Sequence, residues 1–193
     1  MTAANTPERQ IRAVYDEATI RVYQAYRDDI ADTALARGSF VSPPFSMTRM
    51  TWIKPSFLWM MYRAGWGHKD DGQKRILAID ITREGFEWAL TNSSLSHERT
   101  TDASPPVRIQ WDPERDYHHR ALGHRSIQIG LSGTAAQKYV HEWTRRITEI
   151  TPLTHKIHEL ITNDQLDAAK ALHPAERPYP VREQLQRHLQ MIE

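Results

Sequence analysis

The segment QWDPER brings two carboxylates, an amide and a guanidinium together within six residues. A strand is predicted from Val107 to Trp111, and the Asp-Pro pair that follows is expected to close it. A scaffold can hold side chains rigidly at the end of a strand, as catalysis requires. Gln110, Asp112 and Glu114 are therefore the candidate catalytic residues, with either carboxylate as the acid. The structural alternative is an Asp-Pro turn followed by a surface pair of the glutamate and the next arginine.

A second candidate group lies in the stretch from Phe45 to Gly67, which is rich in tryptophan, methionine and basic residues. A strand is predicted from Ser46 to Ile53, and a helix is predicted to begin at Pro55 and Ser56 and to end at Gly65. This helix is apolar nearly all round, which predicts burial. The polar residues held by these two elements are candidate ligand-binding residues: Arg49, Thr51, Lys54, Ser56 and Tyr62.

Charge along this stretch points to an anionic ligand. Residues 45–75 contain six basic residues against two acidic ones, although the whole chain has a formal net charge of only +1. A positive patch beside aromatic residues suits a phosphate-bearing ligand or a nucleic acid. The alternative is a solvated basic rim around a buried helix.

A third group of polar and aromatic residues surrounds a strand predicted from Ile20 to Tyr26. Arginines and aromatic rings can clamp a nucleotide. On that basis Arg12, Tyr23, Gln24 and Tyr26 join the candidate ligand-binding residues. Tyrosines in a strand also pack against their neighbours, which is the structural alternative.

Several kinds of chemistry are excluded or disfavoured by the composition. The chain has no cysteine, which rules out disulfides, thiolate metal sites and cysteine nucleophiles. Its ten histidines lack the His-Glu-x-x-His pattern, so we expect surface histidines and no metal. Neither a glycine-rich phosphate loop nor a Gly-x-Ser-x-Gly nucleophile turn is present.

The longest apolar run, Phe57 to Tyr62, is far shorter than the roughly 20 residues of a membrane span. The first residues are polar and lack the apolar core of a signal peptide. We therefore expect a cytoplasmic protein with no membrane partner.

The order of predicted elements indicates an α+β protein with a mixed or antiparallel sheet and packed helices. Residues 1–8 are predicted to be disordered, residues 9–150 to form the core domain, and residues 151–193 to form a helical extension packed on it. The clearest strand runs from Arg75 to Thr82. Apolar residues at 3.6-residue spacing predict one long helix from Thr134 to Ile150. Residues 91–106, rich in Ser, Thr and Pro, are predicted to form a surface loop.

Five segments together resemble the microbial domain-of-unknown-function family 4291: IRAVYDEATIRVYQAYRDDIADTAL, FSMTRMTWIKPSFLWMMYRAGWG, LAIDITREGFEWAL, IQWDPERD and RSIQIGL. The likeness spans about Arg9 to Ile150, and its tryptophan-rich stretch is the most specific part. That family name implies no activity.

The order of elements is also similar, more distantly, to the ADP-ribosyltransferase fold. In that fold a first strand carries a His or Arg that orients NAD, and this position falls on Gln24. Arg12 or Arg49 would have to substitute. The second motif, which lies near the nicotinamide, falls on Thr51 to Ser56 with Tyr62. The third, often Gln-x-Glu, falls on Gln110-Trp111-Asp112. Gln24 and the third motif depart from the pattern of the ADP-ribosyltransferase family. The resemblance therefore also allows an inactive member of the fold that only binds a nucleotide.

This second resemblance implies NAD as cofactor and transfer of its ADP-ribosyl group through an oxocarbenium-like ribose. Trp52 or Tyr62 would stack on the nicotinamide, and Arg49, Lys54 or Arg12 would neutralise the pyrophosphate. A nucleic acid is the expected acceptor, with a protein or a small molecule as the alternatives. The alternative function is a non-catalytic RNA- or DNA-binding module that uses the basic aromatic surface. A structural protein that pairs through its C-terminal helices is a third reading, and the oligomeric state stays open.

Overall fold

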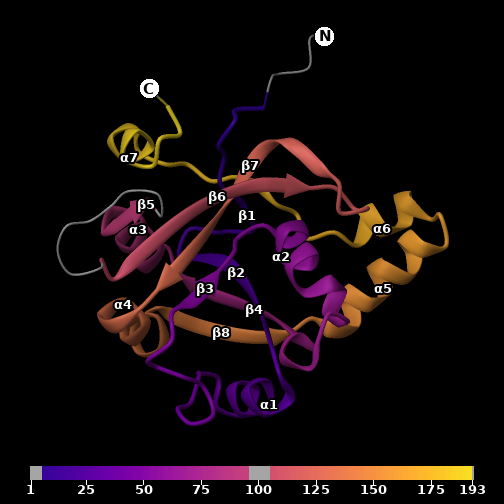
Figure 1. The fold of residues 1–193 in the computed structure, drawn as a ribbon, viewed down its shortest axis with the longest axis horizontal. Helices are drawn as coiled ribbons and strands as arrows, with labels where there is room; N and C mark the ends of the chain where they lie inside the picture. The colour runs from indigo at the N-terminus through magenta and orange to yellow at the C-terminus, as the bar shows by residue number, and fades with distance from the viewer. Residues whose placement is uncertain (1–5, 96–104, 193) are drawn as a thin grey trace.

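The computed structural model describes residues 6–95 and 105–192, and the fold is α+β (Figure 1). Among the described residues the sheets combine antiparallel and parallel pairing. No helix in that part of the chain has the length and apolar character needed to cross a membrane. Residues 1–5 of the segment predicted to be disordered lie outside the described residues.

Two sheets form the centre of the molecule. The first has the order β2-β4-β8, and all of its pairs are antiparallel. Its strands are β2 (Thr19–Tyr26), β4 (Arg75–Thr82) and β8 (Thr144–Glu149). The second has the order β3-β7-β6-β5, with a parallel β5–β6 pair. Its strands are β3 (Thr51–Ile53), β5 (Ser93–Leu95), β6 (Val107–Arg115) and β7 (Ala121–Leu131).

The two sheets meet where β2 passes the end of β3. The backbone N–H of Tyr23 donates a hydrogen bond to the carbonyl of Lys54 at 2.7 Å. A small separate pair, β1 (Arg12–Ala13) with β9 (Arg177–Pro178), ties the two ends of the described chain together. In Figure 1 β1 is labelled just below the point where β6 and β7 cross in this view.

β4 is buried on both faces, which explains its nearly continuous apolar sequence. Leu77, Ile79 and Ile81 belong to one hydrophobic cluster, whereas Ile76 and Ala78 belong to a second cluster formed with α2 (Phe57–Ala64) and α5 (Thr151–Thr162). The strand predicted from Arg75 to Thr82 is confirmed.

The remaining helices pack beside the sheets or form part of the C-terminal segment. They are α1 (Asp28–Arg37), α3 (Arg83–Thr91), α4 (Gly133–Lys138), α6 (Leu166–Leu172) and α7 (Glu183–His188). The signals predicted for α2 are confirmed. Ser56 Oγ accepts a hydrogen bond from the backbone N–H of Trp59 at 3.2 Å, and Gly65 ends the helix with φ 53°.

The long helix predicted from Thr134 to Ile150 is wrong. Helix α4 is followed by a π-helical turn, Tyr139–Trp143, and the chain then becomes strand β8. The sequence of β8, TRRITE, is rich in β-branched residues, and pairing with β4 satisfies its backbone. Apolar residues three or four apart do not reveal that the conformation changes between them.

Three predicted boundaries also differ from the structure. The strand predicted from Ser46 to Ile53 is limited to β3, and the loop predicted over residues 91–106 contains β5, while residues 96–104 lie outside the described residues. Strand β6 does not end at Trp111 but continues through the Asp-Pro pair to Arg115. Proline is accommodated at position 113 because β5 pairs only with residues 107–109, and no other strand of the described residues pairs with that side of β6.

Candidate ligand-binding site

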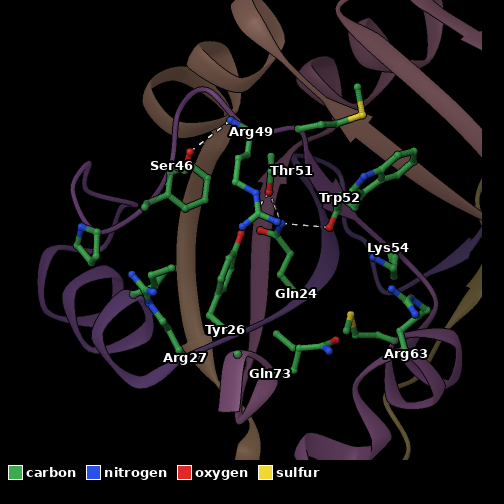
Figure 2. A pocket seen from close by; sticks show the side chains of 17 residues that line it. Gln24, Tyr26, Arg27, Ser46, Arg49, Thr51, Trp52, Lys54, Arg63 and Gln73 are labelled. Carbon is green, nitrogen blue, oxygen red and sulfur yellow. Dashed lines mark hydrogen bonds between the residues drawn. The ribbon is translucent and has the colours of Figure 1, made fainter. Parts of the chain in front are cut away.

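A cavity of about 500 Å³ opens where the two sheets meet. We call it the basic cavity. Its walls come from the end of β2, the loop before β3, β3 itself and helix α2 (Figure 2). Six of the residues that the sequence predicts to bind a ligand line it: Gln24, Tyr26, Arg49, Thr51, Trp52 and Lys54.

Hydrogen bonds between the two sheets fix the floor of the basic cavity. Gln24 Nε2 donates to Thr51 Oγ1 at 2.7 Å and to the Trp52 carbonyl at 3.1 Å. Tyr139 Oη donates to Gln24 Oε1 at 2.6 Å. Burial raises the pKa of the Tyr139 hydroxyl well above its usual value, so it stays protonated and acts as a donor. Gln24 is thereby held in one orientation.

The charge around this cavity has one sign. Its described lining contains four cationic residues and no carboxylate. Arg27 is paired with Asp29 at 2.6 Å. The side chains of Arg49, Lys54 and Arg63 form no hydrogen bond or ion pair with the residues that the structure describes. Figure 2 shows the Arg49 side chain reaching toward Gln24, with Lys54 and Arg63 together at one side. Unpaired cations in a cavity favour an anionic ligand.

Lys54 is the most buried of these cations, with 6% of its surface exposed. Burial, the largest cause, and the nearby Arg63 together lower the pKa of its amine to about 7, while Asp112 opposes the shift. Near pH 7 a larger share of this amine is therefore neutral than in an ordinary lysine.

A second cavity, of about 560 Å³, lies on the other side of Trp52, Lys54 and Arg63, which line both cavities. We call it the second cavity. Gln110 and Asp112 from β6 and Gln128 from β7 form one wall. Gln128 Nε2 donates to Asp112 Oδ2 at 2.6 Å and to Gln110 Oε1 at 2.8 Å.

The opposite wall of the second cavity is aromatic and basic. Trp59 and Tyr62 stack with their ring centroids 5.2 Å apart. The guanidinium of Arg115 lies 3.9 Å from the Tyr62 ring centroid. The second cavity thus combines a carboxylate, two amides and a cation–aromatic wall.

Four predicted site residues line neither cavity: Arg12, Tyr23, Ser56 and Glu114. Ser56 caps α2, and Arg12 Nη2 donates to the Glu176 carbonyl at 3.3 Å. Glu114 is buried with 7% exposure, and burial raises the pKa of its carboxyl. Of the two candidate acids, the structure places only Asp112 in a described cavity.

Gln128 and Tyr139 belong to the site but were not among the predicted residues. Gln128 stands opposite Gln110 in the β6–β7 register, so a correct pairing of the two strands would have revealed it. Tyr139 lies within residues 134–150, for which the sequence wrongly predicts one continuous helix. No sequence signal linked it to Gln24, which lies 115 positions away.

The fold and the site define an α+β protein with a basic cavity at the junction of two sheets. The model of the family described as Domain of unknown function (DUF4291) matches residues 10–179. The chain therefore belongs to this family, and the match includes every residue that lines the two cavities. No curated protein matches the chain.

Proposed function

We propose that this protein binds NAD in the basic cavity and transfers its ADP-ribosyl group to an acceptor, with a nucleic acid as the expected acceptor. One observation carries the proposal. A cavity with three cations that have no partner among residues 6–95 and 105–192 shares a wall with a cavity that presents a carboxylate, Asp112. The cations of the basic cavity suit the pyrophosphate of a dinucleotide. The carboxylate of the second cavity suits cleavage of the glycosidic bond of that dinucleotide.

Binding of the pyrophosphate would fall to Arg49 and Arg63, because charge-assisted hydrogen bonds to phosphate are strong and geometrically specific. The size of the basic cavity lies within the usual range of small-molecule sites, about 300–1,000 Å³. Trp52 stands in the shared wall and offers a ring on which the nicotinamide can stack.

The bond between the ribose C1′ and the nicotinamide nitrogen breaks, and its electron pair leaves with nicotinamide. The ribose becomes oxocarbenium-like, as in glycoside hydrolysis. The Asp112 carboxylate would stabilise that positive charge. The acceptor then forms a bond to C1′ and loses a proton. We assign the acid to Asp112 and not Glu114, because the buried Glu114 lines neither cavity.

In the proposed correspondence with the transferase fold, Gln24 takes the position of a His or Arg. Its amide is already engaged by Thr51 and Tyr139 in the floor of the basic cavity. Arg49, whose side chain reaches toward Gln24 in Figure 2, would supply the missing positive charge.

Calorimetric titration with NAD, with ATP as the comparison ligand, tests the proposal. We expect NAD to bind in preference to ATP, and Arg49→Met to weaken its binding at least tenfold, about 1.4 kcal/mol. Arg37→Met is the matched control, because Arg37 is exposed and lies outside both cavities. Absence of NAD binding by the wild-type protein would overturn the proposal.

A second candidate function is supported by the exposed ring of Tyr62 with Arg115 beside it, a pair that resembles the stacking surfaces that bind single-stranded nucleic acid. In that case the protein binds RNA or DNA without catalysis. Its affinity for a single-stranded oligonucleotide would fall steeply with added salt, because phosphate contacts release counterions. Binding that is insensitive to salt would count against this reading.

A further inference from the structure

Lys54 differs from the other lysines of the chain in having no partner among the described residues. Each of the other five donates a hydrogen bond or forms an ion pair: Lys69, Lys74, Lys138, Lys156 and Lys170. Lys54 forms neither with any residue that the structure describes, yet it is buried, with 6% exposure. A buried cation that served the fold would be paired, since leaving it unpaired costs free energy. Its position therefore points to a ligand.

The backbone holds this lysine in a fixed place. Its carbonyl accepts the hydrogen bond from Tyr23 that joins the two sheets, and Pro55 follows directly. Its side chain lies in the wall shared by the two cavities, so a ligand in either one can reach it.

Charged side chains from α2, from β6 and from the loop before β3 lie around the Lys54 amine. Arg63 from α2 favours its neutral form, and Asp112 from β6 favours its charged form. Arg49, from the loop before β3, lines the basic cavity with it. A lysine that is desolvated and placed beside another cation has the environment of a nucleophilic amine.

We propose that Lys54 is a nucleophilic amine that forms an imine with an aldehyde or ketone carrying a phosphate group. The nitrogen lone pair attacks the carbonyl carbon, and the carbonyl oxygen takes up a proton. The resulting carbinolamine then loses water and leaves a carbon–nitrogen double bond. The phosphate would bind to Arg49 and Arg63, which have no partner among the described residues. This activity goes beyond the transferase proposal and needs no NAD.

Labelling with pyridoxal 5′-phosphate tests this assignment, because that probe joins an aldehyde to a phosphate. The protein is treated at pH 7.4, reduced with borohydride and mapped by peptide mass spectrometry. We expect Lys54 to react at least about tenfold faster than the exposed, paired Lys156, because an ordinary lysine is almost entirely protonated at this pH. Inorganic phosphate should slow the labelling, and pyridoxal without its phosphate should label more weakly.

Two variants complete the test. Lys54→Met should lose the fast-reacting site, whereas Lys74→Met should keep it, since Lys74 is exposed and paired with Asp71. Equal reaction of all lysines, or no labelling at Lys54 in the folded wild type, would overturn the proposal. Fast labelling of Lys54 in a protein that does not bind NAD would retain this inference while rejecting the transferase, so the two can fail separately.

Discussion

The carboxylate of Glu176 accepts a hydrogen bond from the backbone N–H of Phe57 at 2.6 Å, across 119 positions of sequence. Phe57 opens helix α2, whose first N–H groups have no partner within the helix. A carboxylate at this end also interacts favourably with the helix dipole. Because α2 supplies Arg63 to both cavities, Glu176 holds the helix that positions part of the site.

Glu176→Ala should therefore destabilise the protein by about 1–2 kcal/mol, the usual cost of losing a helix cap. The loss would appear as a lower urea midpoint with an unchanged slope. Glu17→Ala is the control, since Glu17 is exposed. Equal stability of the two variants would show that Glu176 does not cap α2.

Asp112→Asn should reduce nicotinamide release from NAD by at least about a hundredfold, if one carboxylate stabilises the ribose cation. Glu114→Gln should change it by less than about twofold, because Glu114 is buried outside both cavities. Initial rates with saturating NAD measure both effects. If Glu114→Gln reduced the rate more than Asp112→Asn, the catalytic carboxylate would be Glu114 and not Asp112.

Gly130→Ala should disturb the wall between the two cavities. A Cβ at this position would lie 2.6 Å from Met50 Sδ and 2.9 Å from Trp52 Cζ2, so the Trp52 ring would have to move. We expect a loss of about 1–3 kcal/mol in stability together with weaker ligand binding. Gly123→Ala, in the same strand, meets nothing within 4 Å and should be neutral on both measures.

Asp80 should make the stability of the protein depend on acid pH. Burial raises the pKa of its carboxyl, but hydrogen bonds from Arg21 and Arg146 outweigh burial and leave that pKa below its usual value. A lowered pKa in the folded state stabilises the protein above the unfolded value, about 3.9, and this contribution is lost as the pH falls through the folded value.

The Asp80→Asn variant should therefore be less stable than the wild type at pH 7, and the difference should shrink below about pH 4. Urea denaturation at a series of pH values measures it. Asp70→Asn is a suitable comparison, because Asp70 is exposed and its carboxylate accepts hydrogen bonds from Gly72 and Gln73 in its own turn. A difference that stays constant with pH would contradict the assignment.

Local signals in the sequence predicted those elements whose cause is local. Ser56 and Gly65 mark the two ends of α2, and the apolar run of β4 reflects burial on both faces. The switch from α4 through a π-helical turn to β8 could not be predicted in this way. It depends on pairing with β4, more than sixty residues earlier in the chain.

The same distinction applies to the site. One short stretch of sequence supplies four of the residues that line the basic cavity, so the sequence predicts them as a group: Arg49, Thr51, Trp52 and Lys54. Gln128 reaches the second cavity only through the register of β6 with β7. Glu114 is adjacent in sequence to residues of that cavity, but a bulge in β6 between Pro113 and Arg115 breaks the alternation of side chains there.

The pairing of β1 with β9 also has a consequence for synthesis of the protein on the ribosome. Arg12 lies opposite Pro178, so β1 cannot pair with β9 until nearly all of the described chain has been translated. Glu176, which caps α2, emerges equally late. The apolar face of α2 must therefore remain incompletely anchored during elongation. A nascent chain that is stalled before residue 176 should be a preferred substrate for chaperones that bind exposed apolar segments.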